Sequence, residues 1–262
     1  ESIVLKYSGT KTSPITIMAE NRHGVTISST GTIIWANNWE DTAYSGPTRY
    51  ISFKGIIFSG STQDRGLFVS RGTCFEDCIF RGGGVAAKGG DAKYIRCIFE
   101  DNTYSGISAG YNDYLFKDCI IRRANQSMTD PGYYEGACKV TYTTGLVVDG
   151  LISYDNYGAG WWCDWDHRNF IIKNSTIFGN HAGEGWRAST NSIENSTGEA
   201  IGIFIEGSPG PGLIENNVIY SCDEGIRIGE SGFSNKIIIR NNKIYDCDYG
   251  INIRGMNRNN PS

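Results

Sequence analysis

Three ionisable side chains recur at one position of a repeated strand in the second half of the chain. They are Lys139, Asp164 and Glu206, and each lies 11 residues before the reference residue of the next repeat copy. Two carboxylates can divide the acid role and the nucleophile or base role of glycosidic bond cleavage. Asp164 and Glu206 are therefore the candidate catalytic residues. The three reference residues are Gly150, Ser175 and Asn217.

Strand alternation assigns a face to each of these side chains. Successive side chains of a strand point to opposite sides of the sheet, so an inward Cys163 places Trp162 and Asp164 outside. An aromatic ring beside carboxylates offers a platform to the C–H groups of a sugar. The alternative interpretation is a solvated, charged face with an aromatic patch that only binds. The candidate substrate-binding residues are Lys139, Trp162, Asp166, His167, Trp186, Arg187, Phe204 and Arg227.

The separation of Asp164 and Glu206 decides the mechanism, and their spacing of 42 residues allows two arrangements. One coil with an inserted loop at 181–200 would place the carboxylates roughly 5 Å apart, as a retaining hydrolase requires. Two coils would place them roughly 10 Å apart, nearer to an inverting hydrolase. The phrase SIENST echoes the earlier IIKNST. This echo favours two coils, with Trp186 and Arg187 between the carboxylates.

The elements that position these residues are copies of one short strand phrase with no helical pattern between them. Their spacings are 22, 19, 22, 31, 25, 42 and 25 residues. Parallel strands that return at this period without a crossover helix predict an all-β, right-handed parallel β-helix. One domain is expected over 1–262, with 1–49 as atypical first coils or a cap. The copies are FKGIIF (53–58), FEDCIF (75–80), YIRCIF (94–99), FKDCII (116–121), VVDGLIS (147–153), IIKNSTIF (171–178), LIENNVIY (213–220) and IIRNNKIY (238–245).

Two kinds of equivalent residue are expected to hold the coils together. Cysteines share slots in successive copies, and a small thiol fills an inward column well, so free thiols are expected rather than disulfides. Asparagine and aspartate share a corner slot, where they are expected to satisfy backbone groups of the turn. The thiol slots are Cys78, Cys97 and Cys119; Cys138 and Cys163; and Cys222 and Cys247. The corner slot holds Asn174, Asn216 and Asn241 with Asp77, Asp118 and Asp149.

Composition and charge narrow the function further. The 24 lysines and arginines against 28 aspartates and glutamates give a net charge of -4, so no nucleic-acid partner is expected. No apolar run approaches the roughly 20 residues of a membrane span. Asp164 and Asp166 have no evident further ligands, so no metal or cofactor is expected. A start at Glu1 fits a processed secreted protein as well as a fragment, and the expected location is secreted, periplasmic or at the cell surface.

Two phrases resemble a family of carbohydrate-active β-helix enzymes. GWWCDWD (160–166) is similar to the GLWLDW phrase that carries a catalytic aspartate in the β-xylosidases of glycoside hydrolase family 120 and related family 141 enzymes. GIFIEGSPGPGLIENN (202–217) is similar to their FVEVNHGP phrase, which carries a catalytic glutamate. The resemblance covers roughly 136–245. It implies hydrolysis of a polysaccharide or oligosaccharide, with Asp164 as the nucleophile and Glu206 as the acid/base.

The other end of the chain suggests a different activity. KYSGTKTSPITIMAEN (6–21) is similar to the opening of the chondroitinase B and alginate lyase family. That resemblance implies a lyase of uronate-containing glycans with calcium as cofactor, and Lys139 would take the place of the family's lysine base. Where the lyase pattern has an arginine, this chain has Asp164. A non-catalytic glycan-binding or structural β-helix is the remaining interpretation.

Overall fold

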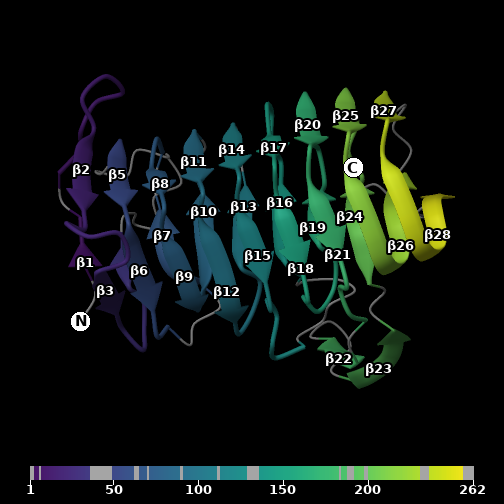
Figure 1. Ribbon diagram of the computed structural model, residues 1–262, viewed down its shortest axis with the longest axis horizontal. Coiled ribbons are helices and arrows are strands. Elements are labelled where there is room, and N and C mark those ends of the chain that lie inside the picture. Colours follow the sequence, from purple (N-terminus) through teal and green to yellow (C-terminus); the bar gives the residue numbers. More distant parts are fainter. Residues whose placement is uncertain are drawn as a thin grey trace.

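The computed structural model is an elongated stack of strands in which coils follow one another from the N-terminal to the C-terminal end (Figure 1). It describes residues 3–5, 7–35, 49–61, 65–69, 71–88, 91–110, 113–128, 136–182, 184–187, 192–197, 200–230 and 236–255. Within these ranges, no helix is long and apolar enough to cross a membrane. Strands of successive coils pair in parallel, so the fold is the single-domain parallel β-helix that the repeat predicts.

Each coil contributes strands to three stacks, here called the first, second and third faces. The first face holds β2 (Ile15–Met18), β5 (Ile51–Lys54), β8 (Cys74–Glu76), β11 (Ala92–Ile95), β14 (Tyr114–Lys117), β17 (Val147–Asp149), β20 (Phe170–Lys173), β25 (Gly212–Glu215) and β27 (Ile237–Arg240). The second face holds β3 (Val25–Ser28), β6 (Ile56–Ser59), β9 (Ile79–Gly82), β12 (Ile98–Asn102), β15 (Ile120–Arg122), β18 (Ile152–Tyr154), β21 (Thr176–Phe178) and the first parts of β26 (Val218–Glu230) and β28 (Lys243–Gly255).

The third face carries the predicted site. It holds β1 (Ile3–Val4), β4 (Ile34–Trp35), β7 (Arg65–Val69), β10 (Gly84–Lys88), β13 (Ile107–Gly110), β16 (Cys138–Thr141), β19 (Trp161–Asp164), β24 (Ile201–Glu206) and the last parts of β26 and β28. Between β21 and β24, the chain forms an antiparallel hairpin that projects from the stack (Figure 1). Its strands are β22 (Glu184–Arg187) and β23 (Ser192–Thr197).

Inward side chains of successive coils stack into columns that fill the interior. The longest aromatic column runs through Phe53, Phe75, Tyr94 and Phe116, whose neighbouring ring centroids lie 5.1, 5.5 and 4.9 Å apart. These separations follow the spacing of about 4.8 Å between paired strands. All four side chains are buried. The apolar core is therefore continuous along the solenoid, with each coil packing on the coil before it.

A corner between the first and second faces turns through left-handed backbone in successive coils. The φ angles of Asp77, Asp118 and Asn174 are 54°, 53° and 54°, a region that aspartate, asparagine and glycine tolerate best. The sequence predicts Asp149 in this slot, but the left-handed residue of that coil is Gly150, with φ of 74°. The predicted alignment is therefore wrong by one residue in this coil.

Backbone groups near this corner are satisfied by the inward residues that follow the corner residues. Asn217 Oδ1 accepts a hydrogen bond from the Ser175 N–H at 2.9 Å, and Asn242 Oδ1 accepts one from the Asn217 N–H at 3.0 Å. The exposed Asn174 side chain instead donates to Asp149 Oδ1 at 2.7 Å. The hydrogen-bonding role that the sequence assigns to the corner residues thus belongs, in these coils, to their inward neighbours.

All eight cysteines are free thiols, as the sequence predicts. Cys222 lies in register with Cys247 on adjacent strands, which confirms their shared slot. Cys138 and Cys163 do not share a slot, because Cys163 lies in register with Val140. The coils are therefore held by backbone hydrogen bonds and packing rather than by covalent links.

The phenol of Tyr94 provides a test of the stacked core. Among the described residues, its hydroxyl oxygen is buried without a hydrogen-bond partner, and burial raises the pKa of the phenol well above its usual value. Removing an unsatisfied buried hydroxyl recovers its desolvation cost. We expect Tyr94→Phe to raise the free energy of unfolding by about 1 kcal/mol in urea denaturation.

Tyr114 is the matched control, because its buried hydroxyl donates to the Gly110 carbonyl oxygen at 2.7 Å. Tyr114→Phe breaks that bond and should lower the free energy of unfolding by about 1 kcal/mol. If both variants shift stability in the same direction, hydrogen-bond satisfaction does not govern these two columns.

Candidate functional site

Asp164 and Glu206 are register partners on the adjacent parallel strands β19 and β24. The two-coil arrangement that the sequence favours is therefore wrong, since the intervening residues form the β22–β23 hairpin outside the coil. Trp186 and Arg187 belong to β22, so they do not occupy a coil between the carboxylates. Their side chains lie outside the described part of the chain.

Lys139 lies on the same outer face as the carboxylates but not in their column. Its register partner is Trp162, and Thr141 is the partner of Asp164. The prediction of one shared column fails because the reference residue of that coil was misplaced at Gly150. Lys139 nevertheless reaches Asp164, with Nζ 3.0 Å from Oδ2, and the same Nζ lies 3.9 Å from the centre of the Trp162 ring.

Trp162 and Phe204 lie on the outer face, as alternation predicts, but they are not open to solvent. Their rings stack with centroids 5.0 Å apart, and only 2% and 5% of their surfaces are exposed. With Ala159 and Ile201 they form a buried cluster separate from the core. The Trp162 Nε1–H donates to Glu206 Oε2 at 3.0 Å. The indole therefore supports a buried carboxylate instead of forming an exposed platform.

A glycine at the start of β24 allows the strands of this face to approach. A Cβ added to Gly202 would lie 2.5 Å from the Gly225 carbonyl oxygen and 2.5 Å from Ile219 Cγ2. Real side chains do not fit at such distances, so any other residue would push β24 away from β26. The glycine thus preserves the strand spacing that holds Glu206 beside Asp164.

The chain turns sharply after Asp164, which removes two predicted residues from the strand face. Trp165 and Asp166 both have left-handed backbone, with φ of 66° and 54°. The half-exposed Asp166 carboxylate accepts a hydrogen bond from Arg168 Nε at 2.9 Å. The alternation argument for Asp166 is therefore wrong, because the residue belongs to a turn and not to β19.

His167 was predicted to contact substrate, but the structure places it wholly in the interior. Its Nε2–H donates to the Val140 carbonyl oxygen at 2.7 Å, and Nδ1 accepts from the Thr143 hydroxyl at 2.6 Å. Burial lowers the pKa of the imidazole to about 4. The prediction is corrected: His167 is a neutral residue that ties two turns together.

Arg227 lies beside the carboxylate pair, in register with Phe204. Its guanidinium lies 5.3 Å from the Phe204 ring and its Nε–H donates to Glu224 Oε2 at 2.6 Å. Glu224 also accepts hydrogen bonds from Asn252 Nδ2 at 2.8 Å and Arg254 Nη2 at 2.5 Å. Sequence reasoning missed these three partners of Arg227. Extending the columns by one coil from Cys222 and Cys247 would have found Asn252 and Arg254.

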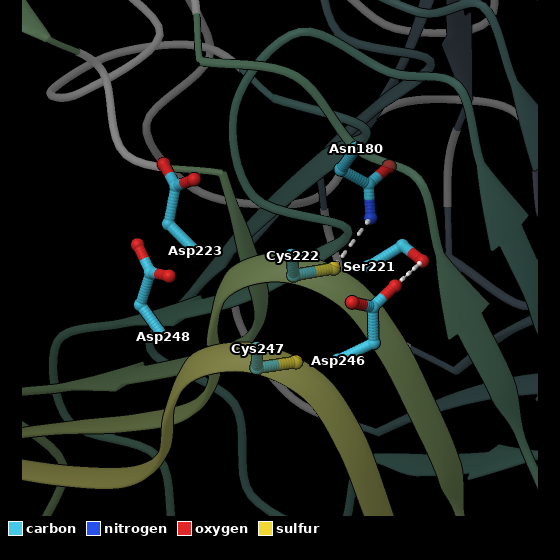
Figure 2. A pocket seen from close by; sticks show the side chains of 7 residues that line it. All are labelled: Asn180, Ser221, Cys222, Asp223, Asp246, Cys247 and Asp248. Carbon is cyan, nitrogen blue, oxygen red and sulfur yellow. Dashed lines mark hydrogen bonds between the residues drawn. The ribbon is translucent and has the colours of Figure 1, made fainter.

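A separate polar hollow of about 310 Å³ lies at the corner between the second and third faces. Figure 2 shows two stacked thiols, Cys222 and Cys247, with Asp223 and Asp248 on one side and Asp246 on the other. Burial raises the pKa of the Cys222 thiol to about 11, which disfavours the thiolate that metals bind. Among the described residues, no three His, Cys, Asp or Glu side chains are arranged to hold a metal ion.

Known proteins similar to this chain share its architecture. A family described as the right-handed β-helix region matches residues 54–197 and 180–260. No curated protein matches the chain. Among solved structures, the chain is similar to pectate lyase Pel9A at 14% sequence identity and a TM-score of 0.43, covering 93% of this chain and 68% of that one. The family match supports the right-handed coil that the sequence predicts.

The buried His167 predicts a pH dependence of stability. Its pKa is about 4 in the folded protein and about 6.5 in an unfolded chain. Between these values the unfolded state binds the extra proton, so the stabilisation is fully present above pH ~6.5 and is lost as the pH falls toward ~4. We expect a loss of about 2 kcal/mol between pH 7.5 and pH 5.0 in urea unfolding.

His167→Gln is the control, because an amide can bond to the Val140 carbonyl and the Thr143 hydroxyl but does not titrate. The variant should lose less stability than the unsubstituted protein over the same pH interval, whatever its stability at pH 7.5. Equal losses in the two proteins would show that another group causes the dependence.

Proposed function

The chain belongs to the family of right-handed β-helix regions, and we propose that it hydrolyses O-glycosidic bonds of a polysaccharide or oligosaccharide. The fold alone does not select this chemistry, because function resides in the site that a fold carries. The proposal rests on the outer surface of the third face. There, two carboxylates lie together with a lysine, two stacked aromatic rings and an arginine.

The observation that carries the proposal is the register of Asp164 with Glu206. Paired parallel strands lie about 4.8 Å apart, so side chains that leave the same face at the same register are about that far apart at their origins. Retaining glycosidases hold their two carboxyl groups roughly 5–5.5 Å apart. The arrangement therefore favours a double displacement over the single displacement of an inverting enzyme.

The surroundings of the two carboxylates suggest different roles. In a double displacement, one carboxylate attacks the anomeric carbon, and the other first donates and later accepts the proton. We assign the attack to Asp164, whose ion pair with Lys139 fits an anionic nucleophile. We assign proton transfer to Glu206, which is 2% exposed and held by the Trp162 N–H. This division agrees with the roles that the resemblance to family 120 implies.

The test is a screen of polysaccharides with analysis of the products. We expect reducing ends without unsaturated sugars, and we expect Asp164→Asn and Glu206→Gln each to lower kcat by about 10²- to 10⁴-fold. Unsaturated products that absorb ultraviolet light would instead indicate elimination. Binding without turnover would indicate a glycan-binding protein. If both variants keep full activity, the catalytic assignment is wrong.

Asp101→Asn is a matched control for Asp164→Asn. Asp101 is half-exposed on the second face, pairs with Arg123 at 2.6 Å, and has a left-handed backbone that asparagine also tolerates. The variant removes the same charge from a distant coil. It should therefore retain the activity of the unsubstituted protein.

A further inference from the structure

The column that contains Glu206 continues past the carboxylate pair toward the end of the solenoid. Glu206 lies in register with Gly229 on β26, and Gly229 lies in register with Arg254 on β28. Gly229 has no side chain, so the outer surface between Glu206 and Arg254 carries none at this position. Two strand spacings place the acid and the guanidinium roughly 10 Å apart along the solenoid axis.

The neighbouring column brings a second guanidinium to the same place. Phe204, Arg227 and Asn252 are consecutive register partners on β24, β26 and β28. The Arg227 side chain is 11% exposed, and its guanidinium lies 5.3 Å from the Phe204 ring. Arg254 is more accessible, with 43% of its side chain exposed. The two arginines thus form one surface with a buried part and an accessible part.

One buried carboxylate holds these two arginines together. Glu224, 2% exposed, accepts from Arg227 Nε at 2.6 Å and from Arg254 Nη2 at 2.5 Å. Two guanidiniums and one carboxylate give this trio a net charge of +1, on a chain whose net charge is -4. Burial, and then the like charge of Arg254, lower the pKa of Arg227 to about 10. An additional anion at this position would stabilise both cations.

We propose that Arg227 and Arg254 form a subsite for an anionic substituent, a carboxylate or a sulfate ester, on a sugar next to the cleaved bond. The inference rests on the proposed function, because it places the subsite beside the carboxylates that would cleave the chain. A planar guanidinium matches two oxygens of such a group and provides directional hydrogen bonds. Glu224 and Asn252 orient the arginines, and Gly229 leaves room for the sugar.

The experiment measures binding to the Glu206→Gln variant by titration calorimetry, so that turnover does not interfere. The probes are matched pairs of oligosaccharides: oligoglucuronates and oligogalacturonates with their carboxyl-reduced counterparts, and sulfated galacto-oligosaccharides with their desulfated counterparts. We expect an anionic member to bind more tightly than its neutral partner, with an affinity that falls as salt is added. The carboxylate and sulfate arms identify which substituent is bound.

Adding Arg254→Gln to that variant should weaken binding of the anionic oligosaccharide about 10- to 100-fold and leave neutral ligands unaffected. Arg254→Lys, which keeps the charge without the planar fork, should give an intermediate affinity. Arg240→Gln is the matched control, because Arg240 is 58% exposed on the first face and pairs with Glu215 at 2.8 Å. It removes the same charge from the same end of the solenoid.

Two results would overturn the inference. One is that no anionic oligosaccharide binds more tightly than its neutral counterpart. The other is that Arg254→Gln and Arg240→Gln weaken binding equally, which would reflect overall charge rather than a subsite. Failure of the proposed function is distinguishable, because it would appear as undiminished turnover by Asp164→Asn and Glu206→Gln while the preference for anionic ligands remained.

Discussion

The structure depends on the backbone ladder between successive coils. Each strand pairs with the equivalent strand of the coil before it and of the coil after it, so a residue's column neighbours are set by register and not by sequence distance. Asp164 is one strand from Thr141, 23 residues earlier, and one strand from Glu206, 42 residues later. Extra residues leave the ladder as the β22–β23 hairpin, and the register of β19 with β24 is unaffected. The solenoid thus accepts insertions beside a site without displacing it.

Strand alternation then divides each residue's environment into an interior and an outer surface. On β19, Trp161 and Cys163 belong to the core, whereas Trp162 and Asp164 face outward. The outer residues are not simply solvated, since Trp162 is 2% exposed and donates to Glu206. A carboxylate in such surroundings interacts more strongly with its partners than it would in water, because the local dielectric is lower. Burial on the outer face therefore makes the few polar contacts of this site energetically important.

The sequence predicted the architecture well because a repeat constrains many residues at once, whereas single positions depend on local register. The strand phrases, the free thiols and the outward position of Trp162 all follow from period and alternation. The errors arose where one residue of turn changes the count. Placing the reference of one coil at Gly150 moved Lys139 into the wrong column, and a left-handed turn removed Asp166 from the strand. No single-sequence signal distinguishes an inserted hairpin from an added coil when its strands echo the repeat.

The charges on the third face illustrate why neighbouring columns must be considered together. Two carboxylates at the same register on adjacent strands repel each other, and the repulsion is strong where water is excluded. Lys139 on one side of the pair and the arginine pair on the other oppose that repulsion. The positive groups lie diagonally or two strands away and do not separate the carboxylates. The face can therefore keep two acids adjacent while it presents cations to the groups that flank them along the solenoid axis.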